Sequence, residues 1–92
     1  MVKSELTESV MLAVPGLLHR DAETAVNAIL GAITDALAND NRVEIRGFGV
    51  FSVATRRARV GRNPRTGQSV PIAAKRILMF RASKEIREAL KG

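Results

Sequence analysis

The chain has 92 residues, with no cysteine and one histidine, so neither a disulfide framework nor a Cys/His zinc site can stabilise it. Fifteen Lys and Arg against nine Asp and Glu give a net charge of +6, which predicts a polyanionic partner: nucleic acid first, an anionic membrane surface second. No apolar run approaches the roughly 20 residues of a membrane span, and the first residues lack a signal-peptide pattern, so we expect a cytoplasmic protein with no membrane partner.

Two helices are predicted in the N-terminal half. An apolar pattern from Leu6 to Val14 has helical spacing, Ser4 is placed to cap this helix, and Pro15-Gly16 ends it. A second pattern, from His19 to Ala38, has apolar residues at every third or fourth position, as in a helix with one buried face. The sequence Asn39-Asp40-Asn41 then predicts a turn.

The pattern then changes from helical to extended. Residues 42–46 alternate polar and apolar side chains, Gly47-Phe48-Gly49 makes a sharp reversal, and residues 50–53 continue as a second strand. Near the C-terminus, residues 77–80 are expected to form a buried strand, and Ser83 is expected to cap a short last helix.

Residues 54–76 contain seven bases, no acid, no aromatic residue and few large apolar side chains. A turn is predicted at Gly61–Gly67, and Pro71 in the returning segment is typical of an edge strand. We therefore expect a β-ribbon that belongs to no core, with arms of about nine or ten residues that reach roughly 30 Å. Its bases are Arg56, Arg57, Arg59, Arg62, Arg65, Lys75 and Arg76.

Charge is divided unevenly along the chain. Residues 1–44 hold three bases and seven acids, a net charge of −4, whereas residues 45–92 hold twelve bases and two acids, a net charge of +10. No acid occurs between Ile45 and Lys84, although surfaces usually mix both signs to limit self-repulsion. This segment is predicted to touch an anionic partner; the alternative is a basic surface with no particular role.

Outside the ribbon, about 70 residues remain to build a core, and their only aromatic residues are Phe48, Phe51 and Phe80. Chains in this position commonly complete their core by oligomerising. We therefore expect a dimer with the three phenylalanines at or near the shared interface. The alternative is a monomer that buries them internally.

Two motifs resemble a known family. Arg46-Gly47-Phe48-Gly49-Val50-Phe51 followed by Gly61-Arg62-Asn63-Pro64-Arg65-Thr66-Gly67 is similar to the signature of the HU and integration host factor proteins. The segment Glu44–Gly49 (EIRGFG) is most similar to the beta subunit of integration host factor, whereas Pro71–Arg76 (PIAAKR) is more similar to HU or the alpha subunit. The resemblance covers essentially the whole chain.

Two positions depart from the pattern of this family. Met79 stands where a proline often precedes the phenylalanine of the third strand, and Ser83 stands where glycine usually precedes the lysine of the last helix. Neither lies at the ribbon tip, so the implied DNA bending is not affected, although phosphate contacts near Ser83 could differ.

The resemblance implies an α+β fold: two N-terminal helices, a three-stranded antiparallel sheet with a long protruding β-ribbon arm, a short C-terminal helix, and an intertwined dimer. Residues 1–92 would form one domain, in which residues 1–53 and 77–92 are the dimerisation body and residues 54–76 are the DNA-binding arm.

The same resemblance implies a bacterial, nucleoid-associated protein that binds and bends double-stranded DNA. It would act as a homodimer or with a paralogous subunit, and would serve nucleoid organisation, recombination and transcription regulation. In this family the two ribbons lie in the minor groove, and a proline at each tip, here Pro64, intercalates between base pairs.

The ribbon residues suit this chemistry. A minor groove about 6 Å wide admits a ribbon with slim side chains, and its potential attracts arginine. Pro64 is rigid and apolar, and Asn63 and Gly67 hold it at a turn, so it can act as a wedge between base pairs. The alternatives are solvated charges for the arginines and an ordinary turn proline for Pro64.

Contacts from the body are expected at two helix starts and one strand. Residues 3–4 and 83–84 lie at predicted helix N-termini, where free backbone N–H groups favour phosphate; simple capping is the alternative. Glu44 and Arg46 share a strand face, so the carboxylate could hold the guanidinium toward the groove or form a plain surface ion pair with it. The complete predicted DNA-binding set is Lys3, Ser4, Glu44, Arg46, Arg56, Arg57, Arg59, Arg62, Asn63, Pro64, Arg65, Thr66, Gly67, Lys75, Arg76, Ser83 and Lys84.

Two other classes of function fit the sequence less well. A basic RNA-binding or ribosome-associated protein is the main alternative, but RNA readers usually stack bases on exposed aromatic residues, and the ribbon has none. An enzyme is not expected, because no cysteine, no P-loop and no carboxylate pair in a basic pocket accompany the single His19. We therefore expect no catalytic residue, metal, cofactor or small-molecule substrate.

Overall fold

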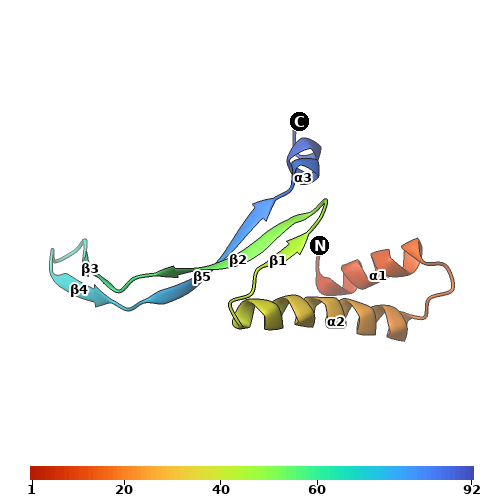
Figure 1. The fold of residues 1–92 in the computed structure, drawn as a ribbon, viewed down its shortest axis with the longest axis horizontal. Coiled ribbons are helices and arrows are strands. Elements are labelled where there is room, and N and C mark those ends of the chain that lie inside the picture. Colours follow the sequence, from red (N-terminus) through yellow and green to blue (C-terminus); the bar gives the residue numbers. More distant parts are fainter.

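A computed structural model describes all residues, 1–92, as a helical pair, a three-stranded sheet that continues into a two-stranded ribbon, and a short last helix (Figure 1). The α+β architecture predicted from the sequence is confirmed. In chain order the elements are α1 (Lys3–Ala13), α2 (His19–Ala38), β1 (Val43–Ile45), β2 (Gly49–Arg56), β3 (Arg59–Arg62), β4 (Ser69–Ile72), β5 (Lys75–Ala82) and α3 (Lys84–Ala89).

Helix α1 begins earlier than the sequence suggested. Val2 is its N-cap residue, and the Glu5 carboxylate accepts a hydrogen bond from the Val2 backbone N–H at 3.2 Å. Because Lys3 is already helical, Ser4 lies inside the first turn, and the prediction that Ser4 caps the helix is wrong. At the other end the helix stops before Pro15-Gly16, as predicted.

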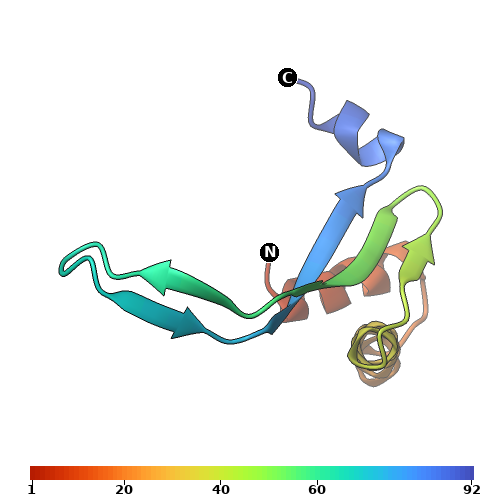
Figure 2. The ribbon, with the colours of Figure 1, turned by 60° about the vertical axis from the view of Figure 1, so that its left-hand side comes forward.

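One antiparallel ladder connects the body to the ribbon. Strands β1, β2 and β5 form a sheet in that order, and β2 pairs with β5 from Gly49 opposite Ala82 to Arg56 opposite Lys75. After an interruption of two residues in each strand, β3 and β4 pair in the same register, with Arg59 opposite Ile72. The ribbon therefore continues the body sheet, and Figures 1 and 2 show it extending away from the helices.

This extension makes the chain much longer than a compact fold. Its radius of gyration is 19.1 Å and its longest dimension is 61 Å, whereas a compact domain of this length has a radius of gyration of about 12 Å. Residues 57–74 lie in the projecting part, so their side chains have no core into which to pack.

The reversal between β1 and β2 depends on two glycines for different reasons. Gly47 has a φ of 82°, which an L side chain rarely adopts. Gly49 is buried, and a Cβ atom there would lie 2.6 Å from both the backbone oxygen of Arg81 and the ring of Phe80. The intervening Phe48 is fixed against the end of β5, because its carbonyl accepts a hydrogen bond from the Ser83 N–H at 2.8 Å.

The isolated chain has almost no core. Only four of its 92 residues are buried. Phe48, Phe51 and Phe80 form a cluster with ring centroids 4.7, 5.6 and 6.2 Å apart, yet Phe48 and Phe80 remain 45% and 44% exposed. A patch of large apolar side chains that stays exposed marks a surface that another molecule covers.

We expect a second copy of the chain to cover this patch, so that thermal stability depends on protein concentration. For a dimer that unfolds to separate chains, each tenfold dilution should lower the free energy of unfolding by about 1.4 kcal/mol and the Tm by about 3–5 °C. Phe80→Ala should lower the stability by a further amount of about 3 kcal/mol, because it empties the centre of the cluster. Circular dichroism melts at several concentrations check both effects.

Glu8→Ala is the control, since Glu8 is an exposed polar residue on α1 with no ion pair, and its truncation should change the Tm little. A Tm that does not change with concentration would contradict the expected dimer.

Candidate nucleic-acid interface

The pairing of β3 with β4 gives the ribbon two slim faces. Side chains alternate between faces along each strand, so directly paired residues share a face. On one face a Cβ atom at Gly61 would lie 2.6 Å from the Cδ1 atom of Ile72, so the glycine leaves room for the isoleucine to cross the ribbon. This face carries Arg59, Gly61, Val70 and Ile72, and the other carries Val60, Arg62, Ser69 and Pro71.

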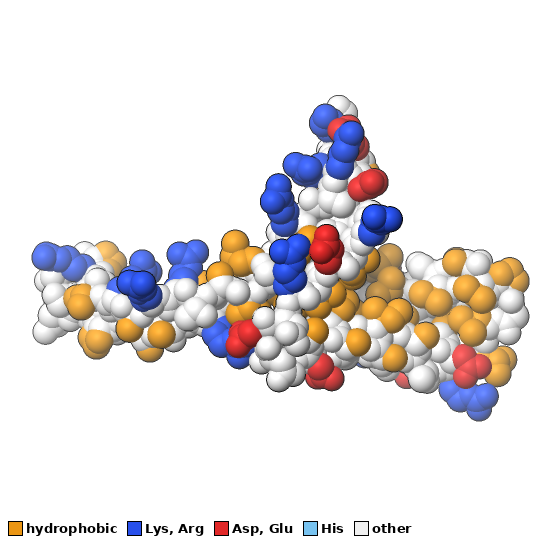
Figure 3. Space-filling model, viewed as in Figure 1, with side chains coloured by type: hydrophobic (Ala, Val, Ile, Leu, Met, Phe, Trp, Pro, Cys, Tyr) orange, Lys and Arg blue, Asp and Glu red, His pale blue; other side chains and the backbone are white.

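Six of the seven ribbon bases have no carboxylate partner. Among the ion pairs of the chain, only that of Arg76 involves the ribbon. Arg56 lies directly opposite Lys75, and like charges in this arrangement destabilise a sheet. Figure 3 shows Lys and Arg side chains along the projecting ribbon with no acidic side chain beside its outer part. The ribbon is therefore a cationic strip whose self-repulsion a polyanion would relieve.

The tip of the ribbon is held by side chains that bond to the backbone of the turn. The side-chain oxygen of Asn63 accepts a hydrogen bond from the Arg65 N–H at 2.8 Å. The backbone carbonyl oxygen of Asn63 accepts another from the Gly67 N–H, also at 2.8 Å. The Thr66 hydroxyl accepts a further backbone hydrogen bond at 3.2 Å. Pro64 lies inside this turn and is exposed, so the end of the ribbon presents a rigid apolar ring to solvent.

Arg76 differs from the other predicted ribbon contacts. Its Nη2 atom donates to the carbonyl oxygens of Leu37 and Ala38, both at 3.1 Å, and to the Asp40 carboxylate at 2.7 Å. The guanidinium that we predicted to lie on DNA thus binds the C-terminal end of α2. No local pattern indicates this, because these partners are 39, 38 and 36 residues away in the sequence.

Glu44 pairs with a different arginine from the one that the sequence suggested. Its Oε2 atom lies 3.3 Å from Nη2 of Arg42, and it forms no ion pair with Arg46. Arg42 and Arg46 lie two residues on either side of Glu44, each one position outside β1, and the ion pair forms with Arg42.

A basic groove on the body contains three arginines that we did not predict as contacts. It lies between the β1–β2 hairpin, the end of β5 and α3. Arg81 and Arg87 take part in no ion pair. Their positions on either side of Ser83-Lys84, which was already assigned to phosphate, could have indicated them. The charged and hydroxyl side chains of the groove are Arg42, Glu44, Arg46, Arg81, Ser83 and Arg87.

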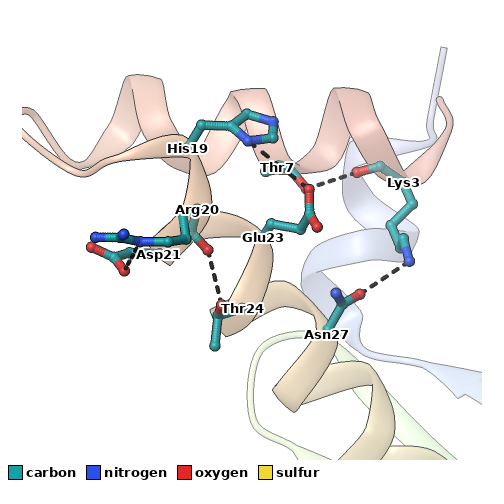
Figure 4. A network of polar contacts seen from close by, with 8 residues as sticks. All are labelled: Lys3, Thr7, His19, Arg20, Asp21, Glu23, Thr24 and Asn27. Atoms are coloured by element: carbon teal, nitrogen blue, oxygen red, sulfur yellow. Dashed lines mark hydrogen bonds and ion pairs between the residues drawn. The ribbon is translucent and has the colours of Figure 1, made fainter.

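The two helix starts differ in their surroundings. Lys3 donates from Nζ to Oδ1 of Asn27 at 3.0 Å, so α1 is tied to α2 at this point (Figure 4). Ser83 accepts a hydrogen bond from the Ile86 N–H at 3.3 Å and caps α3, as predicted. Lys84 is exposed and has no ion pair, so its ammonium is available to an anion.

The helical pair offers little other chemistry. The closest approach of His19 to a carboxylate is 3.9 Å, to Glu23, and both side chains are exposed (Figure 4). No three His, Cys, Asp or Glu side chains lie close enough together to hold a metal ion. None of the three helices is both long enough and apolar enough to span a lipid bilayer.

Comparison with known proteins gives matches along the whole chain. A family model described as bacterial DNA-binding protein matches residues 1–91. HU of Anabaena, in a cocrystal structure with DNA, is 34% identical with a TM-score of 0.84, over 98% of this chain and 97% of that one. HU from Thermotoga maritima is 27% identical with a TM-score of 0.69, over 99% of this chain and 100% of that one. A mutant of transcription factor 1, determined in solution, is 25% identical with a TM-score of 0.66, over 97% of this chain and 89% of that one.

Asn63→Ala should loosen the ribbon tip, because it removes the acceptor for the Arg65 N–H. We expect backbone order parameters at residues 65–67 to fall below about 0.6, while the Tm changes little because the tip contacts no core. Relaxation measurements on ¹⁵N-labelled protein check this. Gln68→Ala removes a side chain with no hydrogen bond and is the control; equal order in the two variants would show that Asn63 does not hold the turn.

Proposed function

Because the chain belongs to the family of bacterial DNA-binding proteins that includes HU, we propose that it is an architectural protein that lays its ribbons in the minor groove of duplex DNA and bends the duplex. One observation carries this proposal: six bases without carboxylate partners lie along a projecting ribbon that ends in an exposed proline.

The ribbon has the dimensions and chemistry that a minor groove requires. Glycine and serine at positions 61 and 69 keep it slim, and a groove about 6 Å wide admits only slim elements. The arginines carry planar donors that reach acceptors on base edges and sugars, and the negative potential of the groove attracts them. Such binding reads groove shape more than base identity.

Pro64 is the proposed wedge. Its ring is rigid, and the hydrogen bonds of Asn63 hold it at the end of the ribbon. A ring inserted between two base pairs unstacks them at a cost of a few kcal/mol and kinks the duplex. Phosphate contacts that the bent DNA makes with the body offset this cost, and the groove with Arg42, Arg46, Arg81 and Arg87 is the proposed place for them.

We propose that two chains form the working unit, so that two ribbons grip one duplex. The partner would be a second copy of this chain or a paralogous subunit. The exposed phenylalanine cluster supports this proposal, because the separate chain buries only four residues.

Within the family, Glu44–Gly49 supports an integration host factor beta type, in which Arg42 and Arg46 beside Glu44 would contact the groove. The proposed setting is the bacterial nucleoid, with roles in its organisation, in recombination and in transcription.

Salt titration of DNA binding tests the electrostatic part of this proposal. The logarithm of the affinity for duplex DNA should fall linearly with the logarithm of the salt concentration, with a slope of about −0.9 per phosphate neutralised. Arg62→Gln removes one ribbon charge from each chain, so in a dimer it should reduce the magnitude of the slope by about 2. Fluorescence anisotropy with labelled duplexes measures both slopes.

Arg20→Gln is the control, because Arg20 lies on α2 beside Asp21 and away from the ribbon. Affinity that is independent of salt would overturn the proposal. Tighter binding to RNA than to duplex DNA of the same length would favour an RNA-binding protein instead.

Pro64→Ala tests the wedge separately from the charge. The bend, measured by energy transfer between the ends of the duplex, should decrease substantially, whereas the affinity should fall less than about tenfold because the phosphate contacts remain. Pro71→Ala replaces the other ribbon proline, in the middle of β4, and should leave the bend unchanged. An undiminished bend with Pro64→Ala would show that the proline does not intercalate.

A further inference from the structure

Arg76 makes the only hydrogen bonds that join the ribbon, residues 54–76, to the helices. It lies at the second position of β5, opposite Thr55, where the ribbon returns to the body. All three of its hydrogen bonds leave from Nη2 and end within four residues of one another, on Leu37, Ala38 and Asp40. A single guanidinium thus connects the base of the ribbon to one end of α2.

The receiving end of α2 lacks a cation of its own. The last carbonyl groups of a helix have no partner within the helix, and their dipoles favour a positive charge. No Lys or Arg occurs in the last turn of α2. Arg76 supplies both the hydrogen-bond donor and the charge from a distant part of the chain.

Asp40 has an unusual backbone for its residue type. Its φ is 59°, and it is the only residue other than glycine with a positive φ in the chain. Glycine would adopt this conformation with less strain. The aspartate instead places a carboxylate 2.7 Å from Arg76, so the strained position is occupied by the residue that completes the contact.

The other ribbon bases show the opposite arrangement. The remaining six have no carboxylate partner, and Lys75, the immediate neighbour of Arg76, is one of them. The three acceptors of Arg76 all meet Nη2, so this side of the guanidinium is held against the body, whereas its Nε and Nη1 N–H groups have no partner. This tie to the body distinguishes Arg76 from the other six bases of the ribbon.

We propose that Arg76 and Asp40 form a clamp that fixes the direction in which the ribbon leaves the body, and that Arg76 is a positioning residue rather than a DNA contact. This inference rests on the proposed function for its effect on DNA, but not for its effect on the free protein. A clamped ribbon is already oriented before DNA arrives, so less conformational freedom is lost on binding.

The clamp and a direct DNA contact predict opposite effects for the same substitution. If Arg76 contacts phosphate, removal of Asp40 frees it and removes a negative charge, so DNA binding becomes tighter. If the two residues form a clamp, removal of Asp40 releases the ribbon and weakens binding. Asp40→Gly is the sharpest variant, because glycine accepts a φ of 59° without strain, so that local damage to the turn is avoided.

The first measurement uses the free protein, so it does not depend on DNA. Because the chain has no cysteine, Glu23→Cys and Gln68→Cys place one spin label on α2 and one at the ribbon tip; dilution with unlabelled chains isolates distances within one chain. Asp40→Gly should broaden the distribution of the label-to-label distance by about twofold, as expected when a local restraint is lost. Asp40→Asn, which keeps one acceptor oxygen, should give an intermediate width.

The second measurement is DNA affinity and its salt dependence. Asp40→Gly should weaken binding by about 3- to 10-fold through lost preorganisation, and Arg76→Gln should weaken it while leaving the salt slope unchanged. In the Arg76→Gln background, Asp40→Gly should have no further effect, because coupled residues are not additive. Asp35→Asn is the control: it removes an α2 acid that has no ion pair, and should not weaken binding.

Failure of the clamp and failure of the proposed function give different results. An unchanged distance distribution in Asp40→Gly, or tighter DNA binding by it, would overturn the clamp. So would a salt slope whose magnitude falls by about 2 in Arg76→Gln, since this is the change expected for a lost phosphate contact in each chain of a dimer. If wild-type protein does not bind DNA at all, the proposed function fails, and the distance measurement still decides on the clamp.

Discussion

The antiparallel pairing of β2 with β5 is the constraint on which the rest of the structure depends. It begins at the buried Gly49, passes the phenylalanine cluster, and ends with Arg56 opposite Lys75, where the projecting ribbon has begun. Backbone hydrogen bonds are the only continuous connection along this path, because the outer ribbon has no core. The same ladder therefore supports two different surfaces: an exposed apolar cluster suited to another protein chain, and a cationic strip suited to a polyanion.

Both surfaces leave the separate chain incomplete. A protein normally offsets the loss of conformational entropy by burying apolar area, but this chain buries four residues and extends over 61 Å. It also keeps most of its ribbon charges unpaired, which adds repulsion. Stability and function are consequently linked: the second chain would supply the missing core, and the nucleic acid would supply the missing negative charge.

The sequence predicted the parts of this structure that depend on local chemistry. The two helices, the reversal at Gly47-Phe48-Gly49, the capping of α3 by Ser83 and the ribbon itself all follow from residue type and spacing. One error arose at an element boundary: Ser4 does not cap α1 because the helix begins at Lys3. A second concerned two equivalent neighbours: Glu44 pairs with Arg42 and not with Arg46, although each lies two residues from it. Boundaries depend on the balance of neighbouring hydrogen bonds, which composition does not specify.

A second kind of information was absent from the sequence because it depends on how distant elements meet. Arg42, Arg81 and Arg87 line one groove only because the sheet register brings the hairpin, the end of β5 and α3 together. Arg76 looked equivalent to its neighbours in an acid-free segment, yet Asp40, 36 residues earlier, is its partner. Charge alone thus predicted a DNA-binding segment, whereas the contacts of each guanidinium show which one is tied to the body. In this ribbon the six bases without carboxylate partners are the proposed DNA contacts, and the paired Arg76 is the proposed positioning residue.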